Sequence, residues 1–83
     1  MFTRTGAYLA EQRRAQHLNS HQLAALLGYT NLVKGARRIL ALERDGNAVD
    51  GLLDHIIKVL GLDQDHVHAL VAEDRRRFED EWN

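Results

Sequence analysis

The apolar residues of this chain recur three or four positions apart in five segments, which is the spacing of one face of a helix. Polar or glycine-containing turns of a few residues separate the segments, and no proline interrupts them. The pattern predicts helices at about residues 5–18, 20–27, 31–44, 49–61 and 63–80. Five helices joined by such short turns predict one compact all-α domain over residues 1–83.

Residue types at the segment ends predict where the second and third helices begin and end. Ser20 is a suitable N-cap for the second helix, and Gly28 is placed to end it in the left-handed conformation. Either Thr30 or Asn31 can cap the third helix. Gly35 lowers helix propensity by about 1 kcal/mol relative to alanine, so the first turn of the third helix is expected to fray or be irregular.

The same spacing predicts which side chains form the core, and Asp63 is placed to cap the fifth helix. The predicted core positions are Tyr8, Ala15 and Leu18 in the first helix, Leu23, Leu26 and Leu27 in the second, and Leu32, Val33, Ala36, Ile39, Leu40 and Leu42 in the third. The fourth segment is apolar at nearly every position that can face inward.

Charge is distributed unevenly along the chain. The formal net charge is −1, but residues 1–44 carry a balance of +5 and residues 45–83 a balance of −6. A basic half beside an acidic half is typical of a domain with one face for nucleic acid. The alternative is that charge simply scatters unevenly in a short chain.

Composition narrows the class further. Apolar residues make up 45% and charged residues 28%, as in soluble globular domains. The absence of cysteine excludes disulfides and zinc–thiolate sites. No apolar run is long enough to span a membrane, and residues 1–20 contain no signal-peptide core. We therefore expect a cytoplasmic protein.

The order of these parts resembles the phage lambda repressor and Cro type of helix-turn-helix protein. The segment "YLAEQRRAQHLNSHQLAALLG" is similar to the first two helices of that family, and "LLDHIIKVLGLDQDHVHAL" is similar to the fourth and fifth. The resemblance covers about residues 5–72. It implies a lambda-repressor-like fold that binds double-stranded DNA, often as a two-fold dimer, to regulate transcription. In this family the first motif helix crosses the DNA backbone and the second enters the major groove.

The stretch "LGYTNLVKGARRILALERDG", residues 27–46, departs from the family pattern. The family has a buried isoleucine about six residues after the turn glycine, where this chain has Lys34. Moving the frame by five residues restores the apolar and acidic pattern at Ile39, Leu42 and Glu43. The stretch therefore looks like the family unit with about five extra residues, drawn from "NLVKGARR", which would add some 7–8 Å of helix. The extension either lengthens the reading helix or blocks the groove.

The predicted DNA-contacting residues lie mainly at the starts of the second and third helices. They are Asn31, Lys34, Arg37 and Arg38 on the third helix, and Ser20, Gln22, Arg13 and Arg14 for the phosphates. Arg37 and Arg38 are also expected to neutralise phosphates. Arginine pairs bidentately with guanine and asparagine with adenine, and a helix start holds a phosphate. The alternatives are a solvated helix face for the first group, and ordinary capping or surface solubility for the second. Tyr29 is expected to pack under the turn.

Other site classes find little support. The pairs His17 with His21 and His66 with His68 lack the geometry of a metal site, and Asp63 is better explained as a helix-start acid than as a catalytic one. We therefore expect no enzyme activity, no cofactor, no metal and no small-molecule substrate.

Two further expectations concern partners. Phe78 and Trp82, four residues apart near the chain end, are the predicted dimer contact, unless they dock on the domain's own core. The alternative function is a protein-interaction module on a helix-turn-helix fold that has lost DNA binding, in keeping with a pI near 6.5. RNA binding is a third possibility, although no aromatic stacking platform supports it.

Overall fold

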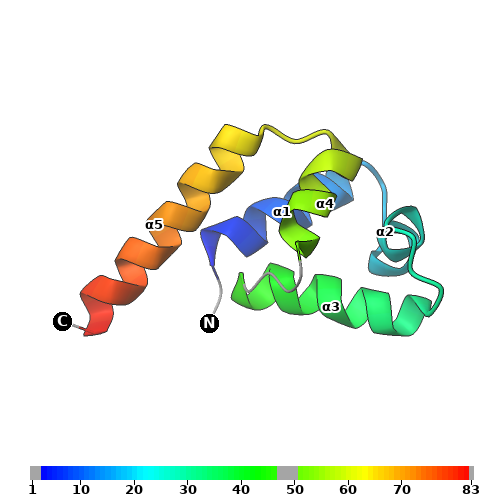
Figure 1. The fold of residues 1–83 in the computed structure, drawn as a ribbon, viewed down its shortest axis with the longest axis horizontal. Coiled ribbons are helices and arrows are strands. Elements are labelled where there is room, and N and C mark those ends of the chain that lie inside the picture. Colours follow the sequence, from blue (N-terminus) through cyan, green and yellow to red (C-terminus); the bar gives the residue numbers. More distant parts are fainter. Residues whose placement is uncertain (1–2, 47–50, 83) are drawn as a thin grey trace.

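Five helices follow one another in the computed structural model, which describes residues 3–46 and 51–82. They are α1 (Arg4–Ala15), α2 (Ser20–Leu26), α3 (Leu32–Asp45), α4 (Leu52–Leu60) and α5 (Gln64–Trp82) (Figure 1). The predicted five-helix, all-α domain is thus confirmed for the described residues. The expected start of the fourth helix, at residue 49, lies outside them. Within the described ranges, no helix has the length and apolar character needed to cross a membrane.

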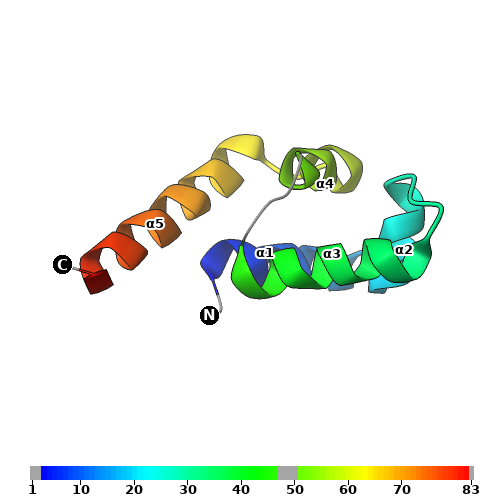
Figure 2. The same ribbon diagram turned by 60° about the horizontal axis from the view of Figure 1, so that its bottom comes forward.

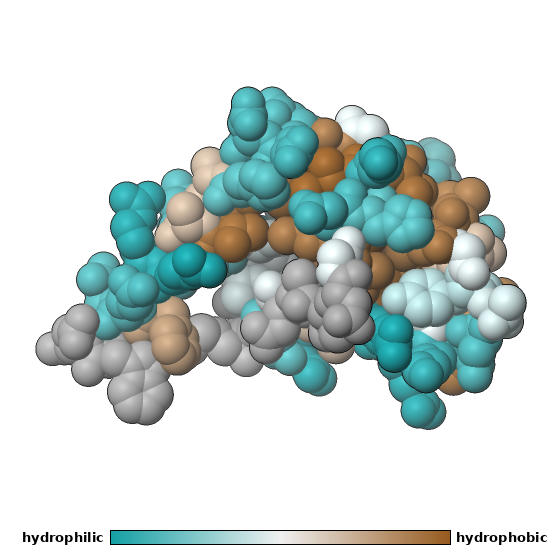
Figure 3. Space-filling model, viewed as in Figure 1, coloured by the Kyte–Doolittle hydropathy of each residue, from teal (hydrophilic) through white to brown (hydrophobic). Residues whose placement is uncertain are grey.

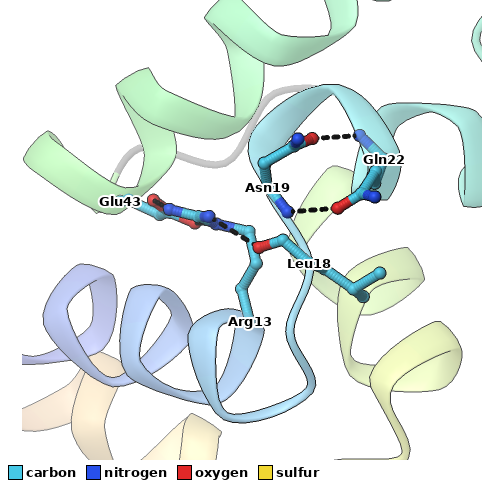
Figure 4. Close-up of polar contacts among 5 residues, drawn as sticks. All are labelled: Arg13, Leu18, Asn19, Gln22 and Glu43. Atoms are coloured by element: carbon cyan, nitrogen blue, oxygen red, sulfur yellow. Dashed lines mark hydrogen bonds and ion pairs between the residues drawn. The ribbon is translucent and has the colours of Figure 1, made fainter.

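The caps explain why the helices begin where they do. Asn19, and not Ser20 as predicted, is the N-cap of α2: its Oδ1 accepts from the Gln22 N–H at 2.7 Å, and Gln22 Oε1 accepts from the Asn19 N–H at 2.8 Å (Figure 4). This reciprocal pair satisfies two free N–H groups, whereas a serine cap alone satisfies one. Asn31 caps α3 by accepting from the Lys34 N–H at 3.1 Å, and Asp63 caps α5 as predicted.

The core lies where α1, α2, α3 and α4 meet. α3 runs antiparallel to α1 and lies beside it in both ribbon views, while α2 packs across the first turns of α3 (Figures 1 and 2). The buried cluster is Leu9, Leu23, Ala24, Leu27, Ile39, Leu42, Leu52, Ile56 and Leu60. Because these side chains come from four helices, none of the helices has a complete apolar environment without the others.

A buried ion pair joins α1 to α3. Arg13 Nε and a terminal nitrogen donate to the two Glu43 carboxylate oxygens at 2.8 and 3.0 Å, and the other terminal nitrogen donates to the Leu18 carbonyl at 2.9 Å (Figure 4). Both charged side chains are less than a tenth exposed. The hydrogen bond to Glu43 raises the pKa of Arg13 against the opposing effect of desolvation, and the charge of Glu43 raises it further.

This ion pair corrects the predicted core face of α1. The side chains that face inward are Thr5, Leu9, Ala10 and Arg13, whereas Ala15 is exposed and Tyr8 and Leu18 are only half-buried. A helix that directs Arg13 toward Glu43 also directs Leu9, four residues earlier, into the core. Gly6 lies on the same face, and a Cβ there would overlap the Glu43 carbonyl, so the two helices touch through their backbones.

α5 is fastened to the start of α1 and then extends beyond the rest of the molecule (Figures 1 and 2). The Asp74 carboxylate accepts from the Arg4 N–H and the Thr5 N–H, each at 3.0 Å, and from the Thr5 hydroxyl at 2.6 Å. Burial opposes ionisation of Asp74, but these hydrogen bonds and the charge of Arg77 outweigh it and lower the pKa of that carboxyl. Asp74 therefore fixes the middle of α5 to the N-terminus of α1.

We predict that Glu43→Gln lowers the free energy of unfolding by about 3–5 kcal/mol, because it leaves the buried Arg13 charge without a compensating negative charge. The double variant Arg13→Met/Glu43→Leu should be markedly more stable than Glu43→Gln, since it buries no charge. Urea unfolding followed by circular dichroism measures both. Arg44→Ala, which removes an exposed ion pair to Asp45, serves as the control and should leave the midpoint unchanged. A Glu43→Gln midpoint equal to that of the control would contradict the prediction.

Candidate nucleic-acid interface

The turn between α2 and α3 is short and well bonded. Gly28 adopts φ +89°, a left-handed conformation that side chains disfavour, and ends α2 as predicted. The next residue, Tyr29, donates its N–H to the Ala24 carbonyl at 3.1 Å, and its half-buried ring packs against the core. The expected packing of Tyr29 under the turn is therefore confirmed.

Gly35 brings α3 into contact with α2. A Cβ on Gly35 would lie 2.7 Å from Tyr29 Cγ and 2.8 Å from Ala24 Cβ, so only a glycine fits between these groups without a shift. The prediction of a frayed or irregular first turn was wrong, because α3 is a regular α-helix from Leu32 onward with Asn31 as its cap. The propensity that glycine loses is offset by close packing of the two helices.

The "NLVKGARR" stretch supplies the cap, Asn31, and the first turns of α3. The helix has 14 residues and begins directly after the turn, so no separate loop stands between turn and helix. The residues of the shifted pattern, Ile39, Leu42 and Glu43, all lie on its buried face. The stretch that departs from the family pattern is therefore helical and forms the N-terminal part of α3.

The three basic residues predicted in this stretch lie at the surface of the first turns of α3. Lys34, Arg37 and Arg38 are exposed, and the Arg38 guanidinium lies over the Tyr29 ring, 5.9 Å from its centroid. That cation–π contact holds Arg38 beside the turn. Hydrophilic residues gather over the start of α3 at the lower right of Figure 3. Contact with DNA is untested and stays a prediction.

Charge on α3 is sorted between its two sides. From Leu32 to Leu42 the helix contains no acidic residue, and Glu43 faces inward, where Arg13 neutralises it. The next acid along the helix is Asp45, which is half-buried and whose carboxylate binds Arg44 at 2.9 Å. Hydrogen bonding between these two side chains raises the pKa of Arg44 and lowers that of Asp45. Between Leu32 and Leu42, the solvent-facing side of α3 therefore carries only basic and apolar side chains.

The predicted phosphate contacts fall into different environments. Gln22 is exposed and Ser20 half-buried at the start of α2; the Gln22 Oε1 is used by the cap, which leaves the amide NH₂ group to donate. Arg14 is exposed at the end of α1. Arg13, by contrast, is buried, and its guanidinium already binds Glu43 and Leu18, so we withdraw it from the set.

The remaining candidates are those for a dimer contact and for a metal site. Phe78 is 51% exposed on α5, and the side chain of Trp82 lies outside the described residues, so their dimer contact stays a prediction. His66 packs edge-on against Tyr8 with ring centroids 4.9 Å apart, and His68 lies 3.7 Å from Asp54. In the part of the chain that the structure describes, no three His, Cys, Asp or Glu side chains gather where they could hold a metal ion.

The sequence pattern did not predict that apolar side chains are also exposed on α2 and α3. Four side chains predicted to be buried are exposed, namely Leu26 (56%), Leu32 (39%), Val33 (54%) and Leu40 (47%). All four belong to α2 or α3. The exposure of some of them on α3 could have been predicted, because apolar residues occupy more of the circumference of α3 than a single buried face can accommodate.

Comparison with known proteins adds no assignment: no protein-family model, curated protein or solved structure matches this chain. The case for a function therefore depends on the residues themselves.

We predict that Gly35→Ala lowers the thermal unfolding midpoint, although alanine is the better helix former. The added methyl group meets Tyr29 and Ala24, and such overpacking costs roughly 1–3 kcal/mol, against a propensity gain of about 1 kcal/mol. Ala41→Gly, at an exposed position of the same helix, is the control for propensity alone. A higher midpoint for Gly35→Ala would show that α2 and α3 do not pack through this glycine.

Proposed function

We propose that this protein is a sequence-specific double-stranded DNA-binding domain of a transcriptional regulator that acts in the cytoplasm. In this proposal α3 enters the major groove and α2 lies across its start. The observation that carries the proposal is the outward side of α3, which presents Lys34, Arg37 and Arg38 and no acid ahead of Asp45. Solvated helix faces usually carry both signs of charge.

The buried ion pair supports the same conclusion. An acid on the outward side of α3 would repel phosphate oxygens, but Glu43 is directed inward and its charge is matched by Arg13. The cationic side chains face the solvent, where they can displace counterions from the DNA backbone. The net charge of −1 is compatible with this role because most of the acidic residues lie after residue 44.

The proposed base contacts come from exposed side chains at the start of α3. We assign Arg37 and Arg38 to guanine, with which arginine pairs bidentately. Asn31 uses its Oδ1 to cap α3, so we assign its NH₂ group a donor role at the groove edge in place of bidentate pairing with adenine. Gln22, Ser20 and Arg14 remain the proposed phosphate contacts that fix the register of the domain.

A two-fold dimer completes the proposal, since domains of this kind commonly read two half-sites. Phe78 is 51% exposed on the C-terminal half of α5, at a hollow that Thr3, Thr5 and Gly46 also line. Hydrophilic residues cover much of α5 (Figure 3), so an aromatic side chain at this position is suited to contact a second copy.

A protein-interaction module is the second candidate. The observation that favours it is the exposure of Leu26, Val33 and Leu40 on the same two helices, because apolar side chains are typical of protein interfaces. The two candidates differ in salt dependence, which is steep for DNA binding and absent if the basic residues contact no phosphate.

We predict that the protein binds labelled random-sequence duplex DNA in a salt-dependent manner, and that Lys34→Ala/Arg37→Ala/Arg38→Ala weakens binding by about tenfold or more. For every phosphate that the variant no longer neutralises, the slope of log affinity against log salt concentration should become shallower by about 0.9. Fluorescence anisotropy across a salt series measures both quantities.

The matched control is Arg4→Ala/Lys58→Ala/Arg76→Ala, which removes the same one lysine and two arginines from exposed positions on α1, α4 and α5. It should bind almost as tightly as the unaltered protein. Equal weakening in the two triple variants would show that general charge, and not α3, governs binding. No binding at low salt by the folded protein would refute the DNA proposal and favour the protein-interaction module.

For the dimer, we predict that Phe78→Glu sediments as a monomer under conditions in which the unaltered protein sediments at twice its 9.5 kDa mass. Ala72→Glu, an equal change of charge at another exposed position of α5, should leave the dimer intact. Sedimentation equilibrium at micromolar concentrations separates the outcomes. A monomer mass for the unaltered protein would contradict the predicted contact.

A further inference from the structure

Two exposed apolar side chains of α3 alternate with two of its arginines along one outward stripe. Val33, Arg37, Leu40 and Arg44 follow one another at i, i+4, i+7 and i+11, so they share a side of the helix. Val33 is 54% and Leu40 47% exposed, and Arg37 stands between them. A single exposed leucine is ordinary. Two exposed apolar side chains on either side of an arginine, on the proposed DNA-facing side of α3, indicate a specific binding partner.

The charge around this stripe indicates which kind of partner it binds. Lys34, Arg37 and Arg38 make the surroundings cationic, so a second copy of the same surface would be repelled. A polyanion that also offers apolar groups fits instead. In the major groove of DNA the only apolar group on a base edge is the C5-methyl of thymine.

The spacing of the stripe suits successive base pairs. Seven residues separate Val33 from Leu40, which is about 10.5 Å along a helix and about three base-pair steps of 3.4 Å. Arg37 lies between them, within one or two steps of either, and arginine is the usual partner of guanine O6 and N7.

We propose that Val33 and Leu40 bind the C5-methyl groups of two thymines on either side of a guanine read by Arg37. This inference rests on the proposed DNA-binding function and names the base-edge chemistry that the function would select. Val33 and Leu40 are then specificity-determining residues.

The test uses a duplex selected from a random library by the unaltered protein, with each thymine replaced in turn by deoxyuridine, which lacks only the methyl group. Removal of a buried methyl group should weaken binding by about fourfold at each of two positions. Val33→Ala should abolish the sensitivity at one position and Leu40→Ala at the other. Leu26→Ala, which alters a comparably exposed side chain on α2, should leave both sensitivities in place.

The outcomes separate this inference from the proposal beneath it. Tight binding that is indifferent to every deoxyuridine replacement, or a selected site without thymine, would overturn the inference and leave DNA binding intact. Equal weakening of thymine and deoxyuridine duplexes by Val33→Ala and Leu40→Ala would overturn it too. Failure to bind any duplex at low salt would refute the proposed function itself.

Discussion

The ion pair between Arg13 and Glu43 is the interaction on which the rest of the structure depends. It sets the rotation of α1, places Leu9 in the core and holds α1 against α3 where Gly6 meets the Glu43 backbone. A buried ion pair is not in itself a large source of stability, because the desolvation of both groups opposes their attraction. Its effect is on geometry: two hydrogen bonds at 2.8 and 3.0 Å permit one orientation of α1 relative to α3.

The same pair determines which charges α3 presents to the solvent. The solvent-facing side of α3 from Asn31 to Ala41 carries basic residues and no acid, and Glu43, the next acid along the helix, faces inward. Packing of Gly35 against Ala24 and Tyr29 then holds the start of α3 against α2. The surface that we propose for DNA is thus a consequence of core packing on the opposite side of the same helix.

Local signals in the sequence were sufficient to predict the number, order and approximate limits of the helices. Glycines with positive φ at 28, 46 and 61 and short-range caps such as Asp63 act within a few residues, so they can be recognised without knowledge of the fold. The faces of the helices were harder to predict. The burial of Arg13 depends on a partner thirty positions away in the sequence, and nothing local distinguishes it from its exposed neighbour Arg14.

Val33 and Leu40 illustrate the opposite difficulty. Their helical spacing and apolar character are those of core residues, yet the core side of α3 is already filled by Ala36, Ile39 and Leu42. Gly35 was misjudged for a related reason, since propensity describes an isolated helix and not one packed against a neighbour. By contrast, the exposure of Lys34, Arg37 and Arg38 could be predicted from their charge, because unpaired lysine and arginine are rarely buried.

The most direct measurement is an NMR titration of the ¹⁵N-labelled protein with a random-sequence DNA duplex at low salt. If α3 is the DNA-binding helix, amide shifts will change at residues 31–41 and at the start of α2, and those of α5 will stay in place. Shifts confined to α5, or none at all, would contradict the placement of the interface on α3.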